Sequence, residues 1–141
     1  MKKKFNILIG ERNPHIREFL RREMVAEGYN VQLAKNSREV LKLVYSSAPI
    51  DLLIIDPDLP GASELNLFKS LEDRIPGLPL VIHGYFFDYL EYFLRMKPVM
   101  FVPKKGNSSE TLKKIVNELL LKANIKRFKT SEDQKRFKET I

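Results

Sequence analysis

Charged side chains that are suited to chemistry directly follow several short apolar runs of the chain. Glu11 and Arg12 come after the first run, and Asp56 follows the third. Gly84 comes shortly after the fourth run, and Lys104 shortly after the fifth. Two acids and two cations that meet at one edge of a fold form a charged pocket, in which an ionic group can be bound and neutralised. These positions are therefore a candidate site, provided that the runs are neighbouring strands.

The apolar runs have the pattern of strands in a parallel sheet. They occupy residues 5–9, 30–34, 51–55, 78–82 and 99–102, and most are continuous rather than alternating in polarity. Continuous runs are typical of strands that are covered on both faces. Amphipathic stretches lie between the runs, so the order is (βα)₅ and indicates an α/β three-layer sandwich. In such sheets ligands bind beyond the carboxyl ends of the strands, where the charged residues stand.

The amphipathic stretches carry recognisable helix ends. Asn13 followed by Pro14 predicts the start of the first helix, and Gly28 predicts its end. Asn36 with Glu39 three residues later resembles a capping box for the second helix. Apolar residues at helical spacing predict three more helices, marked by Leu65, Phe68 and Leu71, by Phe86, Leu90, Phe93 and Leu94, and by Leu112, Ile115, Val116, Leu119 and Leu120.

Length and composition fit one domain. The 141 residues divide into a body of residues 1–122 and a basic tail of residues 123–141, for which a short extra helix is an option. The chain has no cysteine, which excludes disulfides and thiolate metal sites. No apolar stretch approaches a membrane span of roughly 18 residues, so we expect a cytoplasmic protein without a membrane partner. The net charge is +7. However, we find no helix-turn-helix or other nucleic-acid-binding motif after the body, so specific nucleic-acid binding is not expected.

Four blocks of the sequence stand out by their order and spacing. Residues 7–17 join an apolar strand to Glu11, and residues 51–61 run through Asp56 into a proline–glycine loop. Residues 78–82 form the third block, and residues 101–104, which end in Lys104, form the fourth. Together they resemble the response-regulator receiver domain of two-component signalling, the CheY-like family. The resemblance implies a flavodoxin-like fold with a five-stranded parallel sheet of order 2-1-3-4-5.

The resemblance also assigns roles to the candidate residues. It implies that Asp56 is the phosphoacceptor and that Lys104 contacts the phosphoryl group. A carboxylate that attacks a phosphoryl donor forms an acyl phosphate, while cations neutralise the charge of the group in transfer. The family's Mg²⁺ would be held by Glu11, Asp56 and the backbone carbonyl of Asp58. No other cofactor is expected, and no enzyme activity beyond phosphotransfer onto Asp56.

Three departures from the family pattern predict impaired phosphorylation. Arg12 replaces the second acid, which disturbs the Mg²⁺ site. Its guanidinium is expected to pair with Asp56 in the ion's place, and the alternative is that it points to solvent. Gly84 lacks the hydroxyl that ends the family's fourth strand. Gly84 and Phe101 are then switch positions without the usual link between them. Tyr85 replaces a small residue and narrows the approach to Asp56.

We therefore expect an atypical receiver, or pseudo-receiver, that works through protein contacts. A phosphorylation-competent single-domain response regulator is the alternative. A flavodoxin-like cofactor protein is a further one, although the loop of residues 10–13 offers no glycine-rich cradle for phosphate. The expected partners are a histidine kinase or a downstream target, bound through the fourth helix, fifth strand and fifth helix. The same face is a candidate for homodimers. His83 is expected to be structural and to point away from the pocket.

Overall fold

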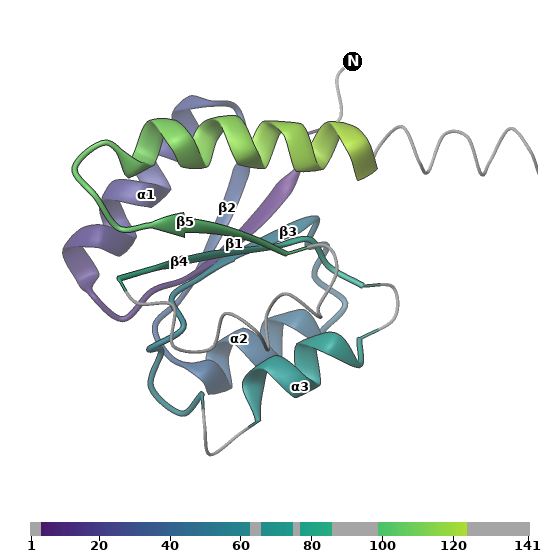
Figure 1. Cartoon of the computed structure of the whole chain (residues 1–141). Coiled ribbons are helices and arrows are strands. Elements are labelled where there is room, and N and C mark those ends of the chain that lie inside the picture. The colour runs from purple at the N-terminus through teal and green to yellow at the C-terminus, as the bar shows by residue number, and fades with distance from the viewer. Residues whose placement is uncertain (1–3, 63–65, 75–76, 86–98, 124–141) are drawn as a thin grey trace, which may run out of the picture.

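The computed structural model describes residues 4–62, 66–74, 77–85 and 99–123. At its centre is a sheet of five parallel strands in the order β2-β1-β3-β4-β5, as predicted (Figure 1). The order reverses at β1, because β2 lies on one side of it and the later strands lie on the other. The strands are β1 (Asn6–Gly10), β2 (Asn30–Ala34), β3 (Leu52–Ile55), β4 (Leu80–Gly84) and β5 (Val99–Pro103).

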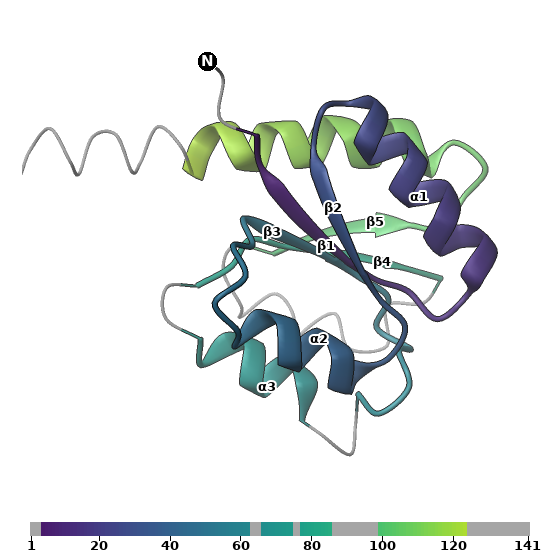
Figure 2. The same cartoon turned by 180° about the vertical axis from the view of Figure 1, so that it is seen from behind.

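Helices cover both faces of the sheet. α1 (Pro14–Ala26) and the helix of residues 108–123 pack on one face, and α2 (Ser37–Val44) and α3 (Leu67–Glu72) pack on the other (Figures 1 and 2). The described residues thus form the predicted three-layer sandwich. The predicted fourth helix lies within residues 86–98, outside the described residues. The basic tail, predicted over residues 123–141, is also outside them except for residue 123, which ends the last described helix. None of the described helices is long and apolar enough to cross a membrane.

Two apolar cores form, one on each face, because successive side chains of a strand point to opposite sides. Leu53 and Ile55 of β3 belong to the core under α2 and α3. Leu52 and Ile54 belong to the core under α1 and the helix of residues 108–123. All four side chains of this strand are buried. A strand that contributes to both cores has to be apolar at every position, which explains the continuous run in the sequence.

Side-chain caps confirm the first two predicted helix starts. Asn13 Oδ1 accepts hydrogen bonds from the backbone N–H groups of His15 and Ile16, at 2.9 and 3.2 Å. Asn36 Oδ1 accepts one from Glu39 N at 2.9 Å. The first N–H groups of a helix have no partner within the helix, so these caps stabilise the helix start. They also fix where the chain turns away from the ends of β1 and β2.

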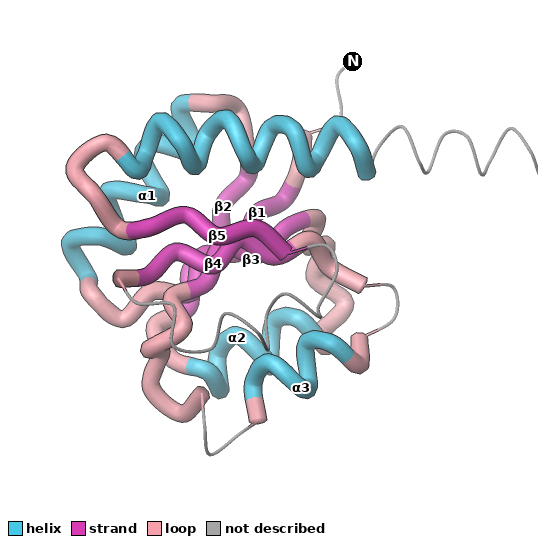
Figure 3. The backbone as a smooth tube through the Cα atoms, in the orientation of Figure 1, coloured by secondary structure: helices cyan, strands magenta, loops and turns pink. Residues whose placement is uncertain are grey.

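The carboxyl ends of neighbouring strands lie level at one edge of the sheet, whose strands run side by side in Figure 3. Gly10, the last residue of β1, is in register with Ile55, the last residue of β3. Gly84 of β4 is likewise in register with Pro103 of β5. Asp56 N donates to Gly10 O at 2.9 Å, which continues the β1–β3 ladder by one residue. The residues that follow these strands therefore leave the sheet at a common edge.

Candidate functional site

Three of the charged residues form a buried ion-pair cluster at this edge. Lys104 Nζ lies 2.7 Å from Glu11 Oε1 and 3.0 Å from Asp56 Oδ2. The side chains are almost inaccessible, with exposed fractions of 7% for Lys104, 2% for Glu11 and 3% for Asp56. The ammonium group bridges two carboxylates that would otherwise repel each other at low dielectric constant. The structure thus brings together the acids that follow β1 and β3 and the lysine that follows β5.

Backbone N–H groups orient both carboxylates. Glu11 Oε2, the oxygen that does not face the lysine, accepts a hydrogen bond from Asn13 N at 3.0 Å. Asp56 Oδ1 accepts one from Asp58 N at 2.9 Å. In each residue one oxygen is therefore held by the loop that follows the strand, and the other is left to face the ammonium group. Carboxylates held in this way need no rearrangement to interact with a cation.

Burial and charge shift two pKa values in the cluster. Burial raises the pKa of Glu11, and the nearby Asp56 carboxylate adds to the rise, although contacts with Lys104 and Asn13 oppose it. Burial alone would lower the pKa of Lys104, but its contacts with Glu11 and Asp56 outweigh burial and raise this pKa. The lysine is consequently a permanent cation near neutral pH.

Arg12 does not take the predicted place beside Asp56. Its side chain is exposed, and it forms no ion pair with any residue that the structure describes. The cation beside Asp56 is Lys104. The reason lies in the end of β1: Glu11 N still bonds to Ala34 O at 3.0 Å, so the strand alternation directs Glu11 inward and the next residue outward. The prediction of an Arg12–Asp56 pair is therefore wrong.

The end of β4 borders the cluster. Lys104 N donates to Gly84 O at 2.9 Å, and a Cβ atom at Gly84 would lie 2.9 Å from both Cγ and Cδ of Pro57. Tyr85 is 59% exposed, and its ring centroid lies 5.2 Å from Lys104 Nζ, within the range of a cation–π contact. Phe101 is half-buried against the core under α2 and α3. The switch roles of Gly84 and Phe101 stay predictions.

The donor atoms of the cluster suit a hard divalent cation. Glu11 and Asp56 supply two buried carboxylates, and Mg²⁺ is commonly held by one or two carboxylates together with water and carbonyl oxygens. Among the described residues no group of three or more acidic, histidine or cysteine side chains is placed to hold a metal. Asp58 is exposed and contacts Asp56 through its backbone N–H. The residues therefore fit Mg²⁺, with only two acidic side chains to balance its charge.

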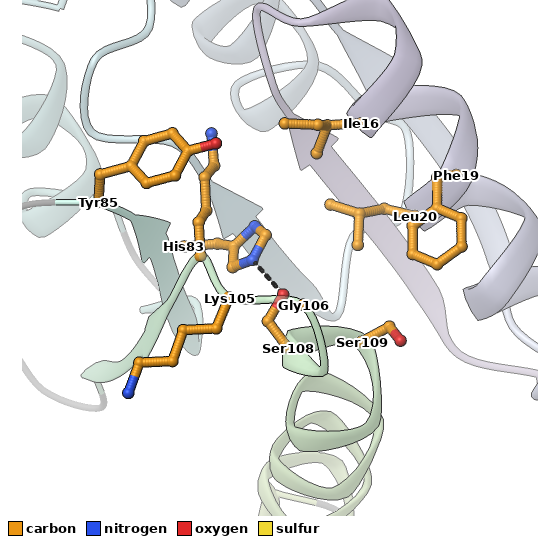
Figure 4. A pocket seen from close by; sticks show the side chains of 10 residues that line it. Ile16, Phe19, Leu20, His83, Tyr85, Lys105, Gly106, Ser108 and Ser109 are labelled. Atoms are coloured by element: carbon orange, nitrogen blue, oxygen red, sulfur yellow. Dashed lines mark hydrogen bonds between the residues drawn. The ribbon is translucent and has the colours of Figure 1, made fainter.

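A pocket lies beside the cluster, on the α1 side of the sheet (Figure 4). Its volume is about 380 Å³, and apolar residues of α1 face the buried side chain of His83 across it. His83 Nε2 lies 3.1 Å from Ser108 Oγ, while Nδ1 has no partner among the described residues. Burial, aided by the charge of Lys104, lowers the pKa of His83 to about 4. His83 is buried, and its structural role stays a prediction. Its contact with Ser108 was not predicted, although a serine at the start of a helix was an available signal.

The titration of His83 should make the fold sensitive to acid. Its pKa is about 4 in the folded chain and near 6.5 in the unfolded chain, so between these values only the unfolded chain binds the proton. The stability that the neutral, buried His83 contributes is therefore fully present above about pH 6.5 and is lost as the pH falls. We expect the His83 contribution to the free energy of unfolding, measured with urea, to fall by about 2 kcal/mol between about pH 7 and pH 5.

The matched pair His83→Gln and His15→Gln isolates this contribution. His15 is exposed at the start of α1, and His83 is 3% exposed. The free energy of unfolding of the His83→Gln variant should lack this fall with pH, whereas that of His15→Gln should still show it. Equal pH slopes for the two variants would contradict the assignment.

The chain belongs to the response regulator receiver domain family, whose pattern it matches over residues 7–117. The family acts in two-component signalling, and the sheet order described above agrees with this membership. The curated relatives include the response regulator MprA of Mycolicibacterium vanbaalenii, which is 33% identical over 76 residues. That match covers 54% of this chain and 32% of MprA, so the chain spans about a third of the length of the curated relatives it matches.

Solved structures agree with the fold. The response regulator protein TrrA from Thermotoga maritima, in complex with Mg²⁺–BeF, matches with a TM-score of 0.70 and 28% identity, over 82% of this chain and 98% of that one. The chemotaxis response regulator CheY4 of Vibrio cholerae matches with a TM-score of 0.73 and 19% identity, over 83% of this chain and 99% of that one. The second likeness concerns the fold alone.

Proposed function

We propose that this chain is an atypical receiver module in which phosphorylation of Asp56 is impaired and which signals through protein contacts. The observation that carries the proposal is the cluster of Glu11, Asp56 and Lys104 with an exposed arginine directly beside it. The cluster keeps the acceptor carboxylate and the lysine that the family resemblance implies. The arginine takes the place of the second acid.

The cluster is arranged for transfer of a phosphoryl group onto Asp56. An oxygen of the Asp56 carboxylate would form a bond to phosphorus while the bond from phosphorus to the donor's leaving atom breaks, which leaves an acyl phosphate. Lys104 Nζ, 3.0 Å from Asp56 Oδ2, is placed to neutralise an oxygen of the incoming group. Mg²⁺, when bound, would supply further charge neutralisation, held by Glu11, Asp56 and the backbone carbonyl of Asp58.

Local features oppose this transfer. When all are ionised, Glu11, Asp56 and Lys104 sum to a single negative charge, and the guanidinium of Arg12 offsets part of its field. A divalent cation is therefore held less tightly than in a site with one more acid. Gly84 offers no hydroxyl to bond a phosphoryl oxygen, and the ring of Tyr85 lies against the ammonium group of Lys104.

A phosphorylation-competent response regulator is the second candidate, and the intact Asp56–Lys104 pair favours it. The flavodoxin-like cofactor protein has less support. Glu11 N and Asn13 N, which would have to bind a phosphate there, already bond to Ala34 O and to Glu11 Oε2. Partners are proposed to be a histidine kinase or a downstream protein. Exposed Met100 on the edge strand β5 and Leu121 on the last described helix lie in the segments predicted for such contacts.

Phosphorylation with a small donor separates the two candidates. After incubation with acetyl phosphate and Mg²⁺, intact-mass measurement should find less than about a tenth of the chain modified, because weak metal binding leaves the charge of the transferring group uncompensated. The Asp56→Asn variant is the blank, since it lacks the acceptor oxygen anion. Rapid addition of one phosphoryl group to the natural chain, absent in the blank, would establish the competent alternative instead.

A further inference from the structure

Pro57 and Gly84 meet in a contact that leaves no room for a side chain. A Cβ atom built on Gly84 would lie 2.9 Å from Cγ and 2.9 Å from Cδ of Pro57, closer than carbon atoms approach without strain. The pyrrolidine ring is closed onto the backbone nitrogen and is unable to swing away as a flexible side chain would. Gly84 is itself buried at the end of β4. The proline ring therefore rests directly on the backbone of β4.

This contact completes a closed circuit of covalent and non-covalent links that includes Asp56 and Lys104. Pro57 is bonded covalently to Asp56, and Gly84 O accepts the hydrogen bond from Lys104 N at 2.9 Å. The last link of this circuit is the ion pair between Lys104 Nζ and Asp56 Oδ2 at 3.0 Å. Any displacement of the end of β4 away from Pro57 thus carries the backbone of Lys104 away from the Asp56 carboxylate. Displacement toward Pro57 is blocked by the ring.

We propose that Pro57 and Gly84 are a matched pair of positioning residues that sets the spacing between Asp56 and Lys104. The proposal deepens the proposed function, because the spacing determines where the ammonium group stands relative to the acceptor carboxylate. It has a consequence for position 84: a side chain there, including one that carries a hydroxyl, is tolerated only after Pro57 is replaced. Glycine at position 84 is therefore coupled to proline at position 57 and is not an isolated change.

A double-mutant cycle with Pro57→Ala, Gly84→Ala and the combined variant tests the pair in the full chain. Gly84→Ala should lower the midpoint of thermal unfolding by roughly 5 °C or more. In the combined variant most of this loss should disappear relative to Pro57→Ala alone. Gly77→Ala is the matched control, since among the described residues no atom outside its chain neighbours lies within 4 Å of a Cβ at that glycine. The control should shift the midpoint far less.

The pKa of the Lys104 amine, followed by NMR of isotopically labelled lysine, tests positioning as distinct from packing. Gly84→Ala should lower this pKa, because the contacts with the carboxylates lengthen, and the combined variant should restore it. The proposal would be overturned if the midpoint shifts of the two single variants simply add in the combined variant. A Lys104 pKa that is the same in Gly84→Ala and Gly77→Ala would also overturn it. If Gly84→Ala does not fold, a combined variant that also does not fold overturns it, and one that folds supports it. None of these measurements uses phosphorylation, so they can fail independently of the proposed function.

Discussion

Replacement of Lys104 by methionine should lower the free energy of unfolding by about 3–5 kcal/mol near neutral pH. Methionine keeps the length of the side chain but removes the charge that lies between two carboxylates, which are 2% and 3% exposed. Glu11 and Asp56 then repel each other in a buried site with no cation between them. Urea unfolding of the variant and the natural chain measures the loss.

Two comparisons identify the cause of this loss. Lys105 is exposed and directly follows Lys104, so Lys105→Met removes the same charge at the surface and should change stability by less than about 0.5 kcal/mol. In Lys104→Met the folded-state pKa of Glu11 should rise further, because the contact with Lys104 that opposes the rise is gone. A carboxyl group with a raised folded pKa gains stability as the pH falls toward its unfolded value. The deficit should therefore shrink on acidification, and a deficit independent of pH would contradict the explanation.

Replacement of Arg12 by aspartate should strengthen Mg²⁺ binding by roughly tenfold or more. The substitution changes the charge beside Glu11 by two units and adds a third carboxylate next to the cluster. Calorimetric titration with MgCl₂ measures the affinity. The gain should decrease in high salt, because the side chain is exposed and its field is screened.

The matched control is Arg22→Asp. Arg22 is exposed on α1, several turns away from Glu11, so the control makes the same change in net charge at a distance. It should leave Mg²⁺ affinity nearly unchanged. A similar gain in both variants would assign the effect to net charge and not to the pocket. No gain in Arg12→Asp would contradict the proposal that Arg12 weakens metal binding.

Most of the fold could be predicted from the sequence because apolar runs and helix caps are local signals. β2 has the predicted bounds, and β3 begins one residue later than predicted. β4 is displaced by two residues: it was predicted over residues 78–82 and covers Leu80–Gly84. Apolarity marks burial, whereas the strand is defined by pairing, and His83 and Gly84 pair with β5 although neither is apolar. A composition pattern alone does not contain that information.

The site was predictable where residue position fixes the geometry. Glu11, Asp56 and Lys104 meet because parallel strands end at one edge, and this follows from topology. The position of Arg12 was predicted wrongly because the directions in which Glu11 and Arg12 point depend on how far the β1 ladder continues. The hydrogen bond from Glu11 N to Ala34 O decides this. The contact between Pro57 and Gly84 was not foreseen. It depends on the distance between two strand ends, for which a single sequence offers no signal.

The aromatic ring beside the lysine has a practical consequence. Tyr85 lies 5.2 Å from Lys104 Nζ, and the chain contains no tryptophan to mask tyrosine fluorescence. Its ultraviolet absorbance and emission respond to the local electric field, so the ring is an optical reporter already built into the molecule. Titrations with cations or phosphate analogues can then be followed without a dye, with Tyr85→Phe as the blank.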